Sequence, residues 1–338
     1  MRKSVILITG ANGEIGHGLI ASLQERRQNI VALDLKVIDS KIQPYVKESI
    51  AGNILDKVLL DQLNAEYHIS EIYHLAALLS TRAEFSPVAA HDVNVGGTLN
   101  LLELSVQQAK SHGTSVKFFF PSSIAVYGIP SLQTKQTLGL VKETDFCHPE
   151  TMYGCNKLYC ENLGAYYSKH YQRLAEDTLP GRVDFRAIRF PGLISAETVP
   201  TGGTSDYAPE MIHAAIQNQP YECFVRPDTT IPFMSMPDAV RSITELMQAP
   251  RENLTQLVYN VTGWSASAED FRLQLLKDYP SVDITWSVNE KRQSIVDSWP
   301  ADVDDHSARQ DWGWKPAYDL KTAFAEYLIP GIKSHYGL

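Results

Sequence analysis

A glycine-rich turn near the amino terminus constrains the fold more than any other feature of this 338-residue chain. The turn contains Gly10, Gly13 and Gly16, follows an apolar run at residues 4–9, and precedes a segment with apolar side chains at helical spacing over residues 15–27. A strand, a glycine turn and a helix in this order present backbone N–H groups and the positive end of a helix to a phosphate. The pattern predicts that a parallel sheet with a phosphate-binding turn begins here.

Short apolar runs continue to alternate with helical segments through the first half of the chain. Strands are expected at residues 4–9, 29–34, 45–50, 71–75 and 116–120, and further along at 183–190 and 256–261. Helices are expected at residues 15–27, 55–66, 89–112 and 153–171. Continuous apolar strands separated by helices are typical of a parallel sheet covered on both faces. We therefore predict an α/β, Rossmann-type doubly wound fold with a mostly parallel seven-stranded sheet.

The second half is less regular, with Pro- and Gly-containing stretches between the sheet elements and a helix opened by residues 267–270. Late insertions after the strands of such a sheet usually build a substrate lobe over their carboxyl ends. We expect residues 1–190, rejoined by 237–262, to form a cofactor-binding Rossmann domain. Residues 191–236 and 263–338 are expected to form a smaller C-terminal substrate-binding lobe.

Composition excludes several classes of function. The net charge is −9, and Lys and Arg never form a run longer than two, so the clustered positive surface that nucleic acids require is not expected. No stretch approaches the roughly 18 apolar residues of a membrane span, and the first apolar run is too short for a signal peptide. We therefore expect a cytoplasmic protein without a membrane partner. The four cysteines show neither C-x-x-C nor zinc spacing, so no disulfide or metal site is expected; they are Cys147, Cys155, Cys160 and Cys223.

Asp34 is expected at the end of the second strand, 18 residues beyond Gly16. A carboxylate at this position can accept hydrogen bonds from the adenosine ribose hydroxyls and repels a 2′-phosphate, which favours NAD over NADP. Leu35 follows where an Arg would favour the phosphate, while Lys36 is close enough to leave NADP open. The alternatives are an ordinary exposed carboxylate at Asp34 and a tight turn without a ligand at the glycines.

Tyr153 and Lys157 lie four residues apart in a predicted helix and therefore share a face. The ammonium can favour the phenolate, whose pKa must fall from about 10 by about 3 units for Tyr153 to act as a base near neutral pH. Ser123 is expected at the carboxyl end of the fifth strand, where its hydroxyl can bond the same substrate oxygen. A surface Tyr–Lys pair is the better interpretation of the isolated motif, but its combination with Ser123 favours a catalytic set.

In chain order, the three glycines, Asp34, residues 73–77, Asn94, Ser123 and the Tyr153/Lys157 pair resemble the extended short-chain dehydrogenase/reductase family, which includes sugar-nucleotide epimerases. The resemblance implies NAD as cofactor and Ser123, Tyr153 and Lys157 as the catalytic trio. Asn53 stands where the family often has Asp, and we expect His74 to be a buried core histidine. The residues predicted at the cofactor are Gly10, Asn12, Gly13, Glu14, Ile15, Gly16, Asp34, Leu35, Asn53, Ile54, Leu75, Ala76, Ala77, Asn94, Tyr153 and Lys157.

The second half resembles one branch of this family, the short-chain-type L-threonine 3-dehydrogenases. The matching segments are residues 78–80, 149–154, 189–195, 202–208, 236–239, 297–300 and 311–316. This branch implies NAD-dependent oxidation of L-threonine at its β-hydroxyl to 2-amino-3-oxobutanoate. The predicted substrate contacts are Ser80, Ser123, Tyr153, Gly203, Thr204 and Trp299. By family analogy we also expect a homodimer through the helices at residues 89–112 and 153–171, with apolar faces at Leu99, Leu102, Leu158 and Leu163.

Two segments depart from the branch and leave alternatives open. Residues 132–142 and 172–182 look like insertions that can reshape the cleft or an interface, so another small hydroxy acid can be the substrate. A sugar-nucleotide epimerase or dehydratase on the same scaffold is a further alternative. Pro191-Gly192 counts against it, because sugar-nucleotide enzymes more often have an Asn-containing segment there. A nucleotide-sensing protein without turnover is disfavoured by the complete catalytic trio.

Overall fold

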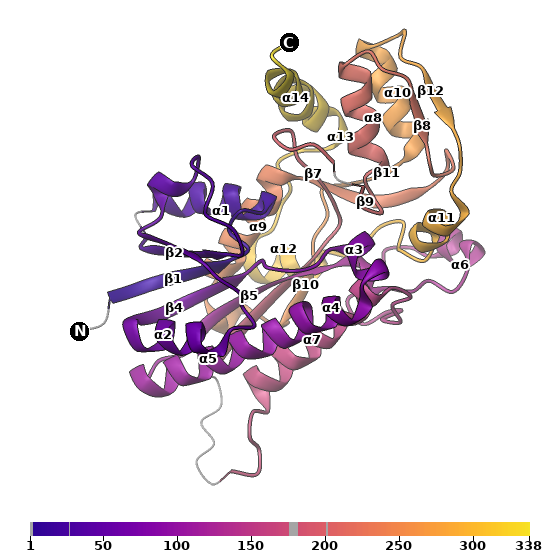
Figure 1. The fold of residues 1–338 in the computed structure, drawn as a ribbon. Helices are drawn as coiled ribbons and strands as arrows, with labels where there is room; N and C mark the ends of the chain where they lie inside the picture. The colour runs from indigo at the N-terminus through magenta and orange to yellow at the C-terminus, as the bar shows by residue number, and fades with distance from the viewer. Residues whose placement is uncertain (1–2, 27, 176–181, 201) are drawn as a thin grey trace.

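The computed structural model describes residues 3–26, 28–175, 182–200 and 202–338. Its centre is a seven-stranded sheet in the order β10-β6-β5-β4-β1-β2-β3 (Figure 1). Every neighbouring pair in this sheet is parallel, which confirms the predicted fold class. The strands are β1 (Lys3–Thr9), β2 (Ile30–Asp34), β3 (Glu48–Ala51), β4 (Tyr67–His74), β5 (Val116–Ser123), β6 (Val183–Phe190) and β10 (Val258–Asn260).

Helices cover both faces of this sheet, which is why a central strand such as β6 is buried at every residue (Figure 1). On one face, α1 (Glu14–Glu25), α9 (Met236–Gln248) and α12 (His306–Trp312) pack around an apolar cluster that includes Leu19, Ile243 and Trp314. On the other face, α2 (Lys57–Glu66), α5 (Gly97–His112) and α7 (Met152–Lys169) pack around a second cluster. Because all the strands run in one direction, their carboxyl ends meet at a single edge, where ligands bind in such folds.

Some predicted boundaries differ from the structure. The strand expected at residues 45–50 is the shorter β3, because Pro44 opens a 3-10 turn at Gln43–Tyr45. The helix expected over residues 89–112 consists of α4 (Pro87–His91), a π-helical turn (Asp92–Gly96) and α5. The first helix ends at Glu25, and residue 27, its predicted end, lies outside the described residues.

A smaller lobe lies over the carboxyl edge of the sheet (Figure 1). It contains a three-stranded sheet of β11 (Trp264–Ser267), β9 (Thr230–Ser235) and β7 (Gly192–Ile194), and a pair formed by β12 (Ile284–Trp286) and β8 (Tyr221–Cys223). Its apolar core includes Phe233, Phe271 and Phe324. The helices around it are α8 (Tyr207–Ile216), α10 (Ala268–Asp278), α11 (Glu290–Asp297), α13 (Leu320–Thr322) and α14 (Ile329–Tyr336). The predicted division of the chain at residues 190, 237 and 262 stays a proposal.

The two segments predicted to be insertions take different forms. Residues 132–142 contain α6 (Leu132–Thr137) and pack against the smaller lobe, where the buried Lys135 ammonium donates to the carbonyl of Val296 at 2.9 Å. Val141 in the same segment forms a parallel bridge with Val303. Of residues 172–182, the first four form an exposed turn after α7, and residues 176–181 lie outside the described residues.

One of the four residues predicted to form the dimer surface does not lie on the surface. Leu102 is fully buried in the core of its own chain and cannot contribute to an interface. Leu158 and Leu163 are partly buried against the two adjoining cores, and Leu99 is exposed. Further exposed apolar side chains on α3 (Ser80–Phe85), α4 and α7 are Phe85, Val88, Tyr159 and Tyr166. The homodimer stays a prediction.

Candidate active site

A cavity of about 1100 Å³ lies along the carboxyl edge of the parallel sheet. Its walls come from the glycine turn, the ends of β2, β4, β5 and β6, and the start of α7. Residues of the smaller lobe, among them 191–193, 198–200 and Trp299, complete them. Every residue predicted for the cofactor, the catalytic trio or the substrate lines this cavity, with the exception of Asn94. Positions as far apart as residues 10 and 299 thus meet in one place.

Close backbone contacts shape the glycine turn. Gly10 has a φ of +69°, and a Cβ there would lie 2.5 Å from the backbone nitrogen of Ala76. A Cβ on Gly16 would lie 2.4 Å from the carbonyl oxygen of Ala11, so Gly16 lets α1 pack against the turn itself. Gly13 has a single contact within 4 Å of a Cβ, at 3.2 Å. The turn is therefore closed behind Gly10 and Gly16, while Gly13 leaves room for a ligand to approach the backbone.

Asp34 ties the end of β2 to this turn. One carboxylate oxygen accepts from the backbone N–H of Asn12 at 3.0 Å, and the other accepts from the N–H of Lys36 at 3.2 Å. The Asn12 side chain in turn accepts from the N–H of Asp39 at 2.8 Å. The Asp34 carboxylate is thus fixed at the cavity wall, which is the position that binding of ribose hydroxyls requires.

Lys157 reaches from α7 toward the end of β5. The Lys157 side chain is buried, and its Nζ donates to the carbonyl of Pro121 at 2.6 Å and lies 5.3 Å from the centre of the Tyr153 ring. Burial lowers the pKa of Lys157 to about 8, against the opposing influence of Cys160 and Glu161. The ammonium is therefore close enough to the phenol ring to influence it, and only part of its usual preference for the proton remains.

Tyr153 and Ser123 occupy the first turn of α7 and the last residue of β5. Thr151 caps α7, its hydroxyl accepting from the N–H of Gly154 at 3.1 Å. Burial raises the pKa of Tyr153 well above the ordinary value of 10, so its phenol needs positive charge nearby to ionise. The Ser123 hydroxyl oxygen accepts from the N–H of Ala125 at 3.2 Å, which leaves its hydrogen to donate into the cavity.

Asn94 supports the cavity wall from behind. It lies in the π-helical turn, and its side chain accepts from the N–H of Leu78 at 2.7 Å and donates to the Leu78 carbonyl at 3.0 Å. This clamp fixes the segment that leads to Ser80, and π-helical turns of this kind often occur at functional sites. His74 is buried between the hydroxyls of Thr9 and Thr98, and burial lowers its pKa to about 3. The expectation of a core histidine is confirmed.

The residues predicted to contact the substrate do not all present free groups. The hydroxyls of Ser80 and Thr204 lie 3.4 Å apart, and the buried Trp299 lines the same cavity. The N–H of Gly203, however, donates to the carboxylate of Asp206 at 2.6 Å. This amide is engaged within its own loop, so the structure does not leave it free to receive a substrate carboxylate.

Sequence reasoning missed the contacts that hold the lobe against the cofactor side of the cavity. Thr198 donates to the carboxylate of Glu14, whose pKa is raised by burial. Thr81 donates to the carbonyl of Gly202 at 2.9 Å. Within the lobe itself, Arg292 donates to the same oxygen at 2.8 Å. The partners are 90 to 184 residues apart, and no motif or periodicity in the sequence connects them.

The described ranges of the chain contain neither a candidate metal-ligand cluster nor a disulfide. No group of three or more His, Cys, Asp or Glu side chains converges there as metal ligands would, and all four cysteines are free. No helix in the same ranges has the length and apolar character needed to cross a membrane.

Comparison with known proteins places the chain in a family. The profile of the NAD dependent epimerase/dehydratase family matches residues 6–262. The chain belongs to this family. Mitochondrial L-threonine 3-dehydrogenase of Bos taurus is 35% identical over 322 residues, covering 93% of this chain and 79% of that protein.

Solved structures show the same relationship over nearly the whole chain. L-threonine dehydrogenase of Clostridium difficile has a TM-score of 0.86 at 33% identity and covers 99% of both chains. A monomeric L-threonine 3-dehydrogenase from a metagenome, in its apo form, has a TM-score of 0.85 at 35% identity, covering 98% of this chain and all of that one.

Family membership implies a nicotinamide dinucleotide as cofactor, and the cavity fits such a group. Its volume of about 1100 Å³ exceeds the usual 300–1000 Å³ of a single drug-sized ligand, so a dinucleotide and a small second substrate can share it. The open side of Gly13 faces this space, and the Asp34 carboxylate is fixed at its wall.

Proposed function

We propose that this protein oxidises L-threonine at the β-hydroxyl to 2-amino-3-oxobutanoate, with NAD as its cofactor. One observation carries the proposal: Ser123, Tyr153 and Lys157 line a single cavity together with the glycine turn and Asp34. The 35% identity to a protein named L-threonine 3-dehydrogenase supports the choice of substrate.

The residues that would hold NAD lie along one wall of the cavity. The backbone of the glycine turn and the amino end of α1 would bind the pyrophosphate, and Asp34 would bind the adenosine ribose. Lys157 would hold the nicotinamide ribose. The bound nicotinamide supplies a hydride acceptor and a positive charge beside Tyr153.

The chain's own residues then handle the substrate proton. The Tyr153 phenolate takes the proton from the β-hydroxyl of threonine, and the Ser123 hydroxyl donates to the same oxygen and orients it. Lys157 must stay protonated for this step, because burial alone raises the pKa of Tyr153. With a pKa of about 8, Lys157 is protonated at neutral pH and loses its charge in mildly alkaline solution.

Binding of a zwitterionic amino acid needs donors for its carboxylate. The hydroxyls of Ser80 and Thr204 are close enough to act together, and Trp299 can cover the methyl group. Neutral donors contribute about 0.5–1.5 kcal/mol each, and somewhat more to a charged group. We therefore expect a Michaelis constant for threonine in the millimolar range.

A substrate panel tests the proposal. Threonine, serine, 3-hydroxybutyrate and UDP-sugars are each incubated with NAD and with NADP, and absorbance of the reduced nicotinamide is followed. NADH formation with threonine is the expected result. Interconversion of UDP-sugars without NADH formation from threonine would overturn the proposal in favour of a sugar-nucleotide epimerase.

A hydroxyl deletion then tests the substrate contacts. Thr204→Val keeps the side-chain shape and should raise the Michaelis constant for threonine with little change in NAD affinity. Thr137→Val provides a matched control, because Thr137 is an exposed threonine on α6 that does not line the cavity. Equal effects of the two substitutions would contradict the predicted contact at Thr204.

A further inference from the structure

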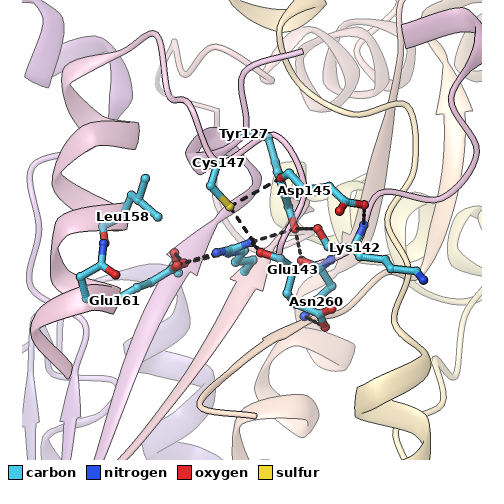
Figure 2. Close-up of polar contacts among 11 residues, drawn as sticks. Tyr127, Lys142, Glu143, Asp145, Cys147, Leu158, Glu161 and Asn260 are labelled. Carbon is cyan, nitrogen blue, oxygen red and sulfur yellow. Dashed lines mark hydrogen bonds and ion pairs between the residues drawn. The ribbon is translucent and has the colours of Figure 1, made fainter. Parts of the chain in front are cut away.

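A buried polar network connects α7 to the carboxyl ends of β5 and β6 (Figure 2). At its centre, Arg189 of β6 forms a two-point ion pair with Glu161 of α7, with Nη2 to Oε2 at 2.6 Å and Nε to Oε1 at 2.8 Å. Both side chains are only 4% exposed. The Ser122 hydroxyl, at the end of β5, donates to Oε1 of the same carboxylate at 2.5 Å. Glu161 thus receives hydrogen bonds from two strands.

Glu161 lies one helical turn beyond Lys157 on α7. Lys157 donates to the carbonyl of Pro121, and Glu161 accepts from the hydroxyl of Ser122, so successive turns of α7 bind successive residues of β5. The next residue of β5 is Ser123, whose hydroxyl faces the cavity. Two bonds one turn apart fix both the rotation and the axial position of the helix relative to Ser123.

The other side of Arg189 anchors the ion pair. Its Nη1 donates to the Tyr127 hydroxyl at 3.0 Å and to the carbonyl of Glu143 at 2.7 Å. The Tyr127 hydroxyl donates to the side chain of Asn260 on β10 at 2.7 Å (Figure 2). A buried ion pair is often no more stabilising than apolar residues of the same volume. Stability alone therefore does not account for a charged network next to the catalytic residues.

We propose that Glu161 is a positioning residue for the reaction: held by Arg189 and Ser122, it fixes Lys157 relative to Ser123 in the geometry that proton removal by Tyr153 needs. The inference rests on the proposed catalytic trio, but it does not depend on which substrate the trio acts on.

The charges around Lys157 give the proposal a second, independent signature. The titratable groups that face Lys157 in the described chain are Tyr153, Cys160 and Glu161 on α7, and His74 on β4. Burial raises the pKa of Tyr153 far above 10 and that of Cys160 to about 11, and it lowers the pKa of His74 to about 3, so these three are neutral at pH 7. Among these groups, Glu161 supplies the negative charge that supports the Lys157 ammonium.

Two variants perturb this network at one site each. Glu161→Gln keeps the shape and one acceptor oxygen but removes the charge, and we expect kcat to fall about tenfold to a hundredfold, in line with small misplacements of catalytic groups. Ser122→Ala removes one buried hydroxyl and is well tolerated in size, and it should lower kcat less than Glu161→Gln does. The Michaelis constants should change less than kcat in Glu161→Gln, because Glu161 does not line the cavity.

The same strand offers a matched control. Asp184 and Arg186 form a comparably buried ion pair on β6, with Nη2 to Oδ2 at 2.6 Å, but at the amino-terminal part of the strand. Asp184→Asn therefore breaks a similar ion pair away from the cavity, and it should lower the melting temperature without changing kcat. If Glu161→Gln and Asp184→Asn reduce kcat to the same degree, the effect is structural and the proposal is overturned.

The pH dependence of NADH binding distinguishes the proposed role of Glu161 from a simple loss of folding. NADH binding, followed by the fluorescence of the nucleotide, should weaken as Lys157 loses its proton, and Glu161→Gln should move this loss to lower pH. Glu161→Asp keeps the charge, so the pH at which half of the NADH binding is lost should return to the wild-type value. Asp184→Asn should leave this midpoint unchanged. An unchanged midpoint in Glu161→Gln would overturn the role of Glu161.

Failure of the proposed function is distinguishable from failure of this inference. The wild-type protein is assayed first on the full substrate panel, and the variants are then compared with whichever substrate it turns over. If the wild type does not oxidise threonine, only the proposed function is refuted. The binding measurement needs no second substrate, so the role of Glu161 is tested in either case.

Discussion

Replacing the buried Lys157 should make the protein more stable while it abolishes turnover. The pKa of Lys157 falls from 10.5 to about 8, chiefly because of burial. At about 1.4 kcal/mol per pH unit, this difference corresponds to a net cost of about 3 kcal/mol for the charged side chain in the folded state. Lys157→Met removes this cost and keeps the length of the side chain. It also leaves the carbonyl of Pro121 without its donor, which costs about 1–2 kcal/mol. The net expectation is a gain of about 1–2 kcal/mol in the free energy of unfolding.

The sign of the pH dependence follows from the direction of the shift. The folded-state pKa of Lys157, about 8, lies below the unfolded value of 10.5, so the cost is fully present below pH 8 and is relieved as the pH rises toward 10.5. The stability difference between Lys157→Met and the wild type should therefore be largest near pH 7. It should shrink by about half or more at pH 9.5.

Lys135 provides a matched control for this prediction. It is also buried, its Nζ also donates to a backbone carbonyl, and burial lowers its pKa to about 8 as well. It does not line the cavity. Lys135→Met should show the same gain in stability and the same pH dependence while NADH formation continues.

Urea denaturation of the ligand-free protein at pH 7 and pH 9.5, followed by circular dichroism, measures the effect. Turnover is measured in parallel through NADH absorbance. If the free energy of unfolding of Lys157→Met is lower than that of the wild type by more than about 1 kcal/mol, the reasoning is refuted. The buried ammonium would then stabilise the fold rather than oppose it. A pH-independent difference between variant and wild type would refute it as well.

Three further predictions concern the base, the cofactor and the assembly. Tyr153→Phe keeps the ring and removes the proton acceptor, so turnover should nearly vanish while NAD binding, measured by titration calorimetry, persists. The wild type should prefer NAD to NADP in kcat/KM, and Asp34→Ala should narrow this preference; comparable use of both cofactors by the wild type would contradict the role of Asp34. Light scattering at micromolar concentration should give the mass of a dimer, and a mass near 37.7 kDa would refute the predicted homodimer.

The parts of the fold and site that the sequence predicts well are those determined by local chemistry. Gly10 is required by its positive φ and by the close approach of Ala76, and both follow from the turn that its motif predicts. Tyr153 and Lys157 share a helix face because of their spacing, and Ser123 meets them because parallel strands end at one edge. These features depend on few residues and on geometry that recurs in every such sheet.

The contacts that the sequence does not predict join residues without any shared periodicity. Arg189 and Glu161 are 28 residues apart on a strand and a helix, and nothing in either segment indicates that they pair. The engagement of the Gly203 amide by Asp206 depends on the conformation of one loop. The burial of Leu102 was missed because α5 packs on the sheet with α2 and α7 beside it, which leaves less free surface than its apolar pattern suggested.

The position of β10 at one edge of the sheet has a consequence for synthesis on the ribosome. Residues 258–260 pair with β6, yet they are made after β7, α8, β8 and β9 of the smaller lobe. Asn260 also supplies an acceptor for the Tyr127 hydroxyl. A nascent chain that has emerged only as far as residue 250 has all its other central strands but leaves the edge of β6 unpaired. Such an edge is a site for wrong pairing with other chains. The interval between residues 190 and 260 is therefore the stage at which chaperones would protect this protein most effectively.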